Sequence, residues 1–408
     1  MINNINDETL IKMRQIVCFA YKHNPYYRKI YDEKEINPET VDLPYGLPII
    51  SHTELVKLPL LFRSSIPIYK VCASSGTINK PKLIFRTEED FEKSVSNQIR
   101  LMQWSNVRPG DVVAIAQPFG MWGYGDLTQE ATRRMGAMAI PIGNLSDETA
   151  LELMITLKAN ILDISPSRLK SIIRLYQNRS IIGELQLKSI MCAGEQVTCG
   201  FKKYVLDTLN AQVYDQYGSE ETDGLGGNNG YNKGIALFND DFIFEVLNDQ
   251  GLPVKESEAG TLVITSLYHK GTPLIRYELQ DIIKQCRNNP LEVEVLGRKC
   301  DYAIIHDSVK LYPYQIEQIL KDEVNDIMGW QCIIEQIDNK IQVIVKIDSQ
   351  NTKQSSLNRI ELLLPKSSID IQSLVQGGNL VFKVEICTDT MIYTNRDKCL
   401  KIIDMRFE

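Results

Sequence analysis

The chain has 408 residues, with 45 Lys and Arg against 52 Asp and Glu, so its formal net charge is −7 at pH 7. A mildly acidic chain of this kind lacks the basic surface that binds nucleic acid. No apolar stretch approaches the roughly 20 residues of a membrane span, and the start lacks the charged and then apolar pattern of a signal peptide. We therefore expect a cytoplasmic protein of more than one domain.

The nine cysteines are scattered along the chain. The nearest two, Cys192 and Cys199, have no histidine beside them, whereas zinc sites need closely clustered ligands. The spacing predicts free thiols in a reducing compartment and no disulfide framework.

The first element expected is an amphipathic helix over residues 8–33 that breaks near Asn24 and Pro25. From Asp111 to Tyr214, short apolar runs alternate with helical segments. Strands joined by helical crossovers form a buried parallel sheet, so this part predicts an α/β fold.

The pattern changes after Gly224, where an Asn/Gly-rich loop precedes alternating strands at 242–246 and 262–267. These strands predict a smaller β-rich lobe. A unit of mixed strands and two helices follows Gly297. We expect a large N-terminal domain of mostly parallel sheets with the β-rich lobe, 1–299, and a small mobile α+β domain, 300–408.

The run from Ala73 to Lys82 combines small hydroxyl residues, a glycine and two lysines. Free amide groups at a tight bend, with lysines nearby, suit a polyphosphate. The run is not a Walker loop, because no second glycine directly precedes a Lys-Ser or Lys-Thr pair. Taken alone, such a cluster is more often a surface turn.

Several further motifs follow this run in a fixed order. They lie at 193–195 (Ala-Gly-Glu), 215–221 (Asp-Gln-Tyr-Gly-Ser-Glu-Glu), 275–281 (Ile-Arg-Tyr-Glu-Leu-Gln-Asp), 296–301 (Leu-Gly-Arg-Lys-Cys-Asp) and 397–404 (Asp-Lys-Cys-Leu-Lys-Ile-Ile-Asp). With the branch-level segments 24–28, 47–51 and 311–317, the chain resembles an adenylate-forming acyl–CoA ligase of the phenylacetate–CoA ligase branch. The resemblance covers essentially the whole chain.

The resemblance implies a reaction in two steps. A small-molecule carboxylic acid attacks the α-phosphate of ATP to give an acyl-AMP and pyrophosphate, and the acyl group then passes to a thiol. Because two anions meet in the first step, the site must supply Mg²⁺, cations and amide dipoles. The implied partners are ATP, Mg²⁺ and the acid, with either CoA or a carrier protein as acceptor, and the oligomeric state is open between monomer and dimer.

The resemblance also assigns roles to residues. The ATP- and AMP-binding set is Ser74, Ser75, Gly76, Thr77, Lys80, Ala193, Gly194, Glu195, Asp215, Tyr217, Gly218, Asp281 and Arg298. Glu221 matches the glutamate that holds Mg²⁺. Lys398 matches the lysine that the small domain brings to the α-phosphate, and Cys300 stands at the hinge where that domain turns.

An aromatic cluster stands where the resemblance places the acyl pocket. It consists of Phe119, Met121, Trp122 and Tyr124, to which Ser165 adds a polar contact. Each of these residues is equally typical of an ordinary core. As a group, they predict an aromatic or medium-sized apolar acid.

Five positions depart from the resemblance, namely Ile78, Asn79, Glu220, Cys300 and Asp307. Ile78 and Asn79 stand in place of threonine and glycine in the phosphate loop. Glu220 replaces a threonine or serine, and its charge should repel the α-phosphate unless it turns away or recognises a cationic substrate group. Asp307 replaces a glycine near the thiol channel. Two alternatives therefore stay open, an amide ligase that passes the acyl-adenylate to an amine and a non-catalytic binding homologue.

Overall fold

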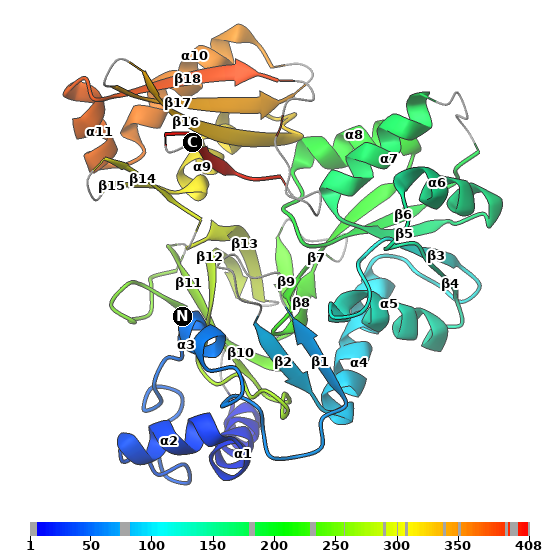
Figure 1. The fold of residues 1–408 in the computed structure, drawn as a ribbon, viewed down its shortest axis with the longest axis vertical. Helices are drawn as coiled ribbons and strands as arrows, with labels where there is room; N and C mark the ends of the chain where they lie inside the picture. The colour runs from blue at the N-terminus through cyan, green and yellow to red at the C-terminus, as the bar shows by residue number, and fades with distance from the viewer. Residues whose placement is uncertain are drawn as a thin grey trace.

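The computed structural model describes most of the chain (Figure 1). The described residues are 6–73, 82–178, 184–228, 234–256, 258–288, 291–299, 301–306, 309–337, 340–349, 352–387, 391 and 399–406. The run 74–81, with its predicted phosphate-binding residues, lies outside them, as do Cys300, Asp307 and Lys398. The roles given to these residues stay predictions.

The N-terminal segment is a helix pair, α1 (Asp7–His23) and α2 (Pro25–Glu33), as predicted. The break falls at Asn24, whose backbone is extended and whose side chain accepts from the N–H groups of Tyr26 and Tyr27. Pro25 starts α2, where its missing N–H costs nothing. No helix in the described part of the chain combines the length and hydropathy that a membrane span requires.

An eleven-stranded sheet runs through the large N-terminal part, in the order β10-β11-β12-β13-β9-β8-β7-β6-β5-β3-β4. Its parallel strands are β3 (Val112–Ile115), β4 (Met138–Pro141), β5 (Ile161–Ile164), β6 (Ser189–Cys192) and β7 (Gln212–Ser219). They confirm the predicted parallel sheet, and apolar residues on both faces bury it between helices.

The helices cover the two faces of this parallel part (Figure 1). One face packs against α4 (Glu88–Trp104) and α5 (Gly123–Arg134) through a core that includes Ile115 and Met191. The other face packs against α6 (Asp147–Thr156), α7 (Pro166–Asn178) and α8 (Cys199–Leu209).

The predicted β-rich lobe continues the same sheet. Its strands are β8 (Asp223–Gly227), β9 (Ile235–Leu237), β10 (Phe242–Leu247), β11 (Ala259–Ser266), β12 (Tyr277–Asn288) and β13 (Leu291–Arg298). Strand β7 joins the two lobes, since Cys192 pairs with Asp215 in parallel and Tyr217 pairs with Gly226 in antiparallel register. The parallel strands and the β-rich lobe thus form one continuous sheet.

Two smaller elements flank the β-rich lobe. Helix α3 (His52–Lys57) begins at Ser51 with a capping box to Glu54. A two-stranded antiparallel ribbon, β1 (Lys70–Ala73) and β2 (Leu83–Arg86), stands beside α4 (Figure 1). Residues 74–81, the run predicted to bind phosphate, come between these two strands in the sequence.

The C-terminal part has its own four-stranded sheet, ordered β18-β17-β16-β19, and its own apolar core. The strands of this part are β14 (Ala303–His306), β15 (Val309–Leu311), β16 (Gly329–Ile337), β17 (Lys340–Asp348), β18 (Leu380–Ile386) and β19 (Ile402–Asp404). Its described helices are α9 (Pro313–Glu323), α10 (Gln354–Leu363) and α11 (Ile369–Gln376). The expected two helices are thus three, because a 3₁₀ turn at Leu364–Lys366 separates α10 from α11.

Contacts with α7 and α8 hold the C-terminal part above the strand ends. The Lys170 Nζ donates to Asp348 Oδ2 at 2.8 Å and to the Met328 carbonyl at 2.9 Å. Gly200 lies so close that a Cβ there would sit 2.3 Å from the Asp326 carbonyl carbon. The two parts are therefore packed together in this conformation.

Candidate functional site

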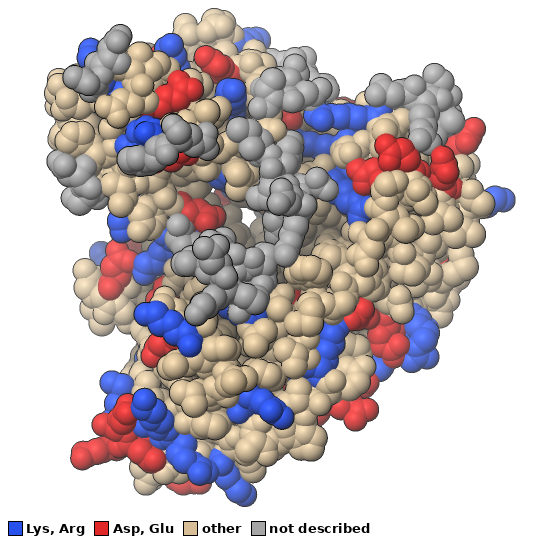
Figure 2. Space-filling view, in the orientation of Figure 1, with Lys and Arg blue, Asp and Glu red and all other residues tan. Residues whose placement is uncertain are grey.

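A cleft of about 2970 Å³ separates the strand ends from the C-terminal part. Figure 2 shows an opening between these two parts of the molecule. The predicted residues that line the cleft are Trp122, Tyr124, Ser165, Ala193, Gly194, Glu195, Asp215, Tyr217, Gly218, Glu221, Asp281 and Arg298. Ligands of open α/β sheets bind at the carboxyl ends of the strands, and the cleft lies there.

Three predicted nucleotide-binding residues meet at one edge of the cleft. The Tyr217 hydroxyl donates to Asp281 Oδ2 at 2.6 Å, and Arg298 Nε lies 3.3 Å from Asp281 Oδ1. Asp281 and Arg298 face each other across β12 and β13. Burial raises the pKa of Asp281, and the Arg298 charge offsets this only in part. A carboxylate with two oxygens beside an aromatic ring suits a ribose and its base.

The opposite edge follows β6 and the parallel half of β7. The Ser167 hydroxyl donates to Glu195 Oε2 at 2.5 Å, which fixes the segment from Ala193 to Glu195 against the start of α7. Desolvation raises the pKa of Asp215 to about 7. At Gly218, a Cβ would sit 2.0 Å from the Asp223 carbonyl oxygen, so only glycine permits this approach of β7 to β8.

Glu221 lies buried between the two edges. Its Oε1 accepts from the Lys82 ammonium, and Tyr277 Oη lies 3.2 Å from the same oxygen. Burial alone would raise the pKa of Glu221, but the charge and hydrogen bond of Lys82, together with the Arg298 charge, outweigh it and lower the pKa to about 2. Glu221 is therefore an anion at neutral pH.

Lys82 is a candidate functional residue that the sequence analysis did not single out. It is the last lysine of the Lys-Pro-Lys segment, and its position directly before β2 turns its side chain into the cleft. Its position could have indicated this role, because Lys82 directly adjoins the buried strand β2.

Arg86 supports the segment that carries Glu221. Its Nη2 donates to the carbonyls of Glu220 at 3.0 Å and of Glu221 at 2.7 Å. Its Nε donates to Asp223 Oδ2 at 3.1 Å, and Asp223 has a left-handed φ of 56°. The buried guanidinium thus fixes the backbone on both sides of the carboxylate.

Glu220 turns away from Glu221 and toward α5. Its Oε1 accepts from the Gly123 N–H, at the start of that helix, over 2.8 Å. Burial raises the pKa of Glu220 to about 7, although the Gly123 N–H favours the charged form. Glu220 nevertheless lines the same cleft as Glu221.

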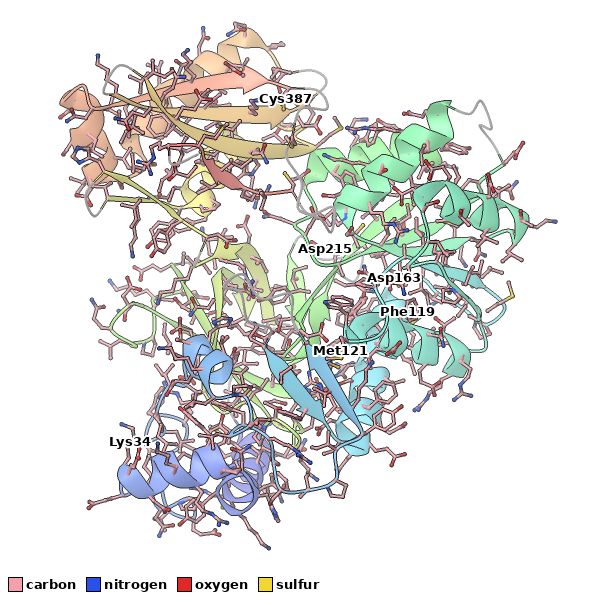
Figure 3. The ribbon with its side chains drawn as sticks, viewed as in Figure 1. Lys34, Phe119, Met121, Asp163, Asp215 and Cys387 are labelled. Atoms are coloured by element: carbon pink, nitrogen blue, oxygen red, sulfur yellow. The ribbon has the colours of Figure 1, made fainter. Side chains whose placement is uncertain are left out.

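The aromatic cluster divides into two pairs, and Figure 3 labels one of them, Phe119 and Met121. Trp122 and Tyr124 line the cleft, and Ser165 joins them there. Phe119 packs against the core under α4 and α5, and Met121 is 47% exposed. Neither Phe119 nor Met121 is among the residues that line the cleft.

Replacing Trp122 with alanine should change which acids are accepted more than it changes the affinity for ATP. The indole lines the cleft at the start of α5, while Tyr217 and Asp281 lie at another edge. Initial rates over a set of acids, together with calorimetric ATP titration, measure both effects. An unchanged acid profile combined with a lower melting temperature would make Trp122 an ordinary core residue.

Asp163, in β5, is a buried carboxylate that the sequence analysis did not mention. It is fully buried, and Gln117 Nε2 donates to its Oδ1 over 3.2 Å. Burial raises its pKa to about 7. A carboxyl group whose pKa is raised in the folded state adds to the stability of the fold. This contribution is fully present below the unfolded-state pKa, near 4, and is lost as the pH rises through the folded-state pKa of about 7.

Asp163→Asn should therefore become more stable relative to the parent protein as the pH rises from 5 to 8. We expect a gain on the order of 2–3 kcal/mol in the free energy of unfolding, because the variant has no carboxylate to ionise. Denaturant unfolding of both proteins at each pH measures it. Glu220 and Asp215, whose pKa values are also raised, are common to both proteins and cancel in the difference. Parallel pH profiles would contradict the expectation.

No protein-family model matches the chain. A phenylacetate–coenzyme A ligase of Thermus thermophilus is 26% identical over 328 residues, which are 76% of this chain and 73% of that protein. A crystal structure of 2-hydroxyisobutyryl-CoA ligase in the postadenylation state, in complex with R3-HIB-AMP, has a TM-score of 0.77 at 19% identity, covering 98% of this chain and 90% of the other. An open conformation of that ligase with 2-HIB-AMP and CoA gives 0.69 at 19% identity, covering 98% and 91%.

Proposed function

Because the chain is a homologue of the phenylacetate–coenzyme A ligases and has the fold of the adenylate-forming acyl–CoA ligases, we propose that it activates a small carboxylic acid with ATP and transfers the acyl group to CoA. One observation carries this proposal. Tyr217, Asp281 and Arg298 form a hydrogen-bonded group in the same cleft as the ionised Glu221. This arrangement supports a nucleoside site beside a site for phosphate and metal.

In the first half-reaction, a carboxylate oxygen of the acid bonds to the α-phosphorus, and the bond from that phosphorus to the bridging oxygen of pyrophosphate breaks. Asp281 accepts hydrogen bonds from the ribose hydroxyls, and Tyr217 lies against the base. Arg298 and Lys82 contribute positive charge where two anions approach. Such fixed charges act strongly in a site from which water is excluded.

Mg²⁺ fits Glu221. Carboxylate oxygen is its preferred protein ligand, and Mg²⁺ in nucleotide sites often uses one or two carboxylates with phosphate and water. Glu221 stays ionised, and only its Oε1 is taken by Lys82 and Tyr277. The described residues contain no cluster of three His, Cys, Asp or Glu that would hold a metal without the nucleotide. The ion would neutralise phosphate charge.

The C-terminal part supplies the remaining cation in this proposal. Lys398 reaches the α-phosphate for adenylation and is carried away when residues 300–408 turn about Cys300 as a mobile domain. The separate core of the C-terminal part supports a boundary at 299 and 300. Ser74, Ser75, Gly76, Thr77 and Lys80 would cover the β- and γ-phosphates from the β1–β2 connection.

The second half-reaction breaks the bond between the acyl carbon and the AMP oxygen, and a thiolate sulfur takes the acyl group. CoA is the acceptor that the relatives' names support. A carrier-protein thiol and an amine remain the alternative acceptors, and a non-catalytic homologue is disfavoured because Glu221, Asp281 and Arg298 all line one cleft.

Pyrophosphate release over a panel of aromatic and medium-sized acids tests the proposal, with Mg²⁺ present and with and without CoA. We expect ATP- and acid-dependent release, and an acyl-CoA product by mass spectrometry when CoA is added. Release without thioester, but with amide when an amine is supplied, would favour the amide ligase. Folded protein that binds no ATP in calorimetry would remove the enzymatic proposal altogether.

A further inference from the structure

Four carboxyl groups lie around the start of α5 and the turn between β7 and β8. Three of them are ion-paired, in the pairs Lys70–Asp126, Lys82–Glu221 and Arg86–Asp223. Glu220 is the fourth, and among the residues that the structure describes it has no Lys or Arg within 4.0 Å. In this group of carboxylates, Glu220 is therefore the one whose charge the protein does not balance with a cation of its own.

The Glu220 side chain is held in place through one oxygen only. Its Oε1 accepts from the Gly123 N–H at 2.8 Å, and a Cβ at Gly123 would lie 3.3 Å from that oxygen and 3.1 Å from Cys72 Sγ. The Arg86 Nη2 fixes the backbone by donating to the Glu220 carbonyl at 3.0 Å. The other oxygen, Oε2, accepts no hydrogen bond from the described residues and is not closed off from solvent.

The position of this open oxygen places it at the predicted acyl pocket. Glu220 lines the cleft together with Trp122 and Tyr124. Trp122 directly precedes Gly123, the residue that binds Glu220, and both stand at the start of α5. The carboxylate is therefore beside the indole, in the part of the cleft where the acid is expected to bind.

We propose that the acid which this protein activates carries a protonated amino group, and that this ammonium binds Glu220 Oε2. The inference rests on the proposed adenylation function and specifies its substrate class. The ammonium supplies the cation that Glu220 lacks and donates to the oxygen that Gly123 leaves open. An acid without an amino group brings only its own carboxylate, a second anion, toward this charge.

The expected consequence is selectivity between closely related acids. A site built to hydrogen-bond a substrate group rejects the analogue that lacks the group, because the polar atom of the protein then loses water without gaining a partner. For Glu220 that atom carries charge, which makes the loss larger than for a neutral group. Hydrogen bonds to a charged group predict a preference of about 10- to 100-fold for the amino-bearing acid.

The kinetic form of this preference separates Glu220 from Glu221. An ammonium held away from the reacting phosphorus is bound alike before and during the reaction, so its loss raises KM and leaves kcat nearly unchanged. Loss of a group that acts on the phosphates, as proposed for Glu221, lowers kcat instead.

The test compares matched acids by pyrophosphate release with the full-length protein, ATP and Mg²⁺. Phenylpropanoate is paired with phenylalanine and β-phenylalanine, and benzoate with the ring isomers of aminomethylbenzoate, so that the ammonium stands at different distances from the carboxylate. We expect kcat/KM for the best amino-bearing acid to exceed that of its parent about 10-fold or more.

Glu220→Gln keeps an oxygen to accept from the Gly123 N–H but removes the charge. It should lower the ratio of the two kcat/KM values by about 10-fold, through the KM of the amino-bearing acid, while pyrophosphate release from the parent acid persists. Asp126→Asn is the matched control, because Asp126 is also a carboxylate near the start of α5 but pairs with Lys70 and is not among the residues that line the cleft. This control should keep the ratio of the unmodified protein.

Two results would overturn the inference. One is a parent acid that the unmodified protein uses as well as every amino-bearing form, a comparison that holds even if Glu220→Gln does not fold. The other is an unchanged ratio in folded Glu220→Gln. If no acid of either kind releases pyrophosphate, the proposed function itself fails.

Discussion

Replacing Glu221 with glutamine is expected to slow pyrophosphate release by about 100-fold or more, because fixed charge at the reacting phosphates is often the largest catalytic contribution. The glutamine keeps the shape of the side chain but loses the anion that would hold Mg²⁺. The rate should also become nearly insensitive to Mg²⁺ concentration at levels that saturate the parent protein. Initial rates measured against Mg²⁺ concentration report both changes.

The stability of this variant needs a separate measurement. Lys82 is buried and pairs with Glu221, so the substitution leaves an uncompensated buried ammonium and should cost about 3–5 kcal/mol. Rates are therefore referred to the folded fraction, measured by denaturant unfolding. Glu220→Gln is the matched control one residue away and should lower the rate far less. If Glu220→Gln is the more damaging, the assignment of the metal-binding glutamate is shifted by one residue.

Replacing Lys398 with alanine should slow acyl-AMP formation by orders of magnitude and leave acyl transfer intact. The lysine is proposed to offset the repulsion between carboxylate and α-phosphate only while the C-terminal part faces the nucleotide. Pyrophosphate release measures the first half-reaction. Synthetic acyl-adenylate, supplied with CoA, measures the second half-reaction without the first.

An equal loss in both assays would contradict the division of labour between the two orientations and would give Lys398 a role in the fold. Lys170→Met is a control for disturbed packing of the C-terminal part. It removes the ion pair between Lys170 of α7 and Asp348 of that part. It should disturb the packing of the two parts without removing charge from the phosphate site.

The elements that local pattern determines were predictable. The break at Asn24 follows from a capping side chain followed by proline, and the parallel strands follow from apolar runs between helices. The grouping of Tyr217, Asp281 and Arg298 came from motif order, and the structure brings the three together.

The features set by distant contacts were not predictable. The direction of Glu220 depends on an N–H of Gly123, 97 residues away, and the Lys82–Glu221 pair spans 139 residues. Asp163 stands in an ordinary-looking apolar strand, and its lack of a cation appears only when the whole chain is folded. The continuous sheet depends on β7, which pairs with β6 along its first half and with β8 along its second. Strand propensity does not indicate such a change of partner.

The most direct test of adenylation follows an oxygen atom of the acid. An accepted acid, labelled with ¹⁸O in its carboxylate, is converted with ATP, Mg²⁺ and CoA, and the nucleotide and phosphate products are analysed by mass spectrometry. If a carboxylate oxygen bonds to the α-phosphorus, it stays with AMP when the thiol takes the acyl group, so adenylation predicts one ¹⁸O in AMP and none in pyrophosphate. ADP with labelled inorganic phosphate would show attack at the γ-phosphate and contradict adenylation.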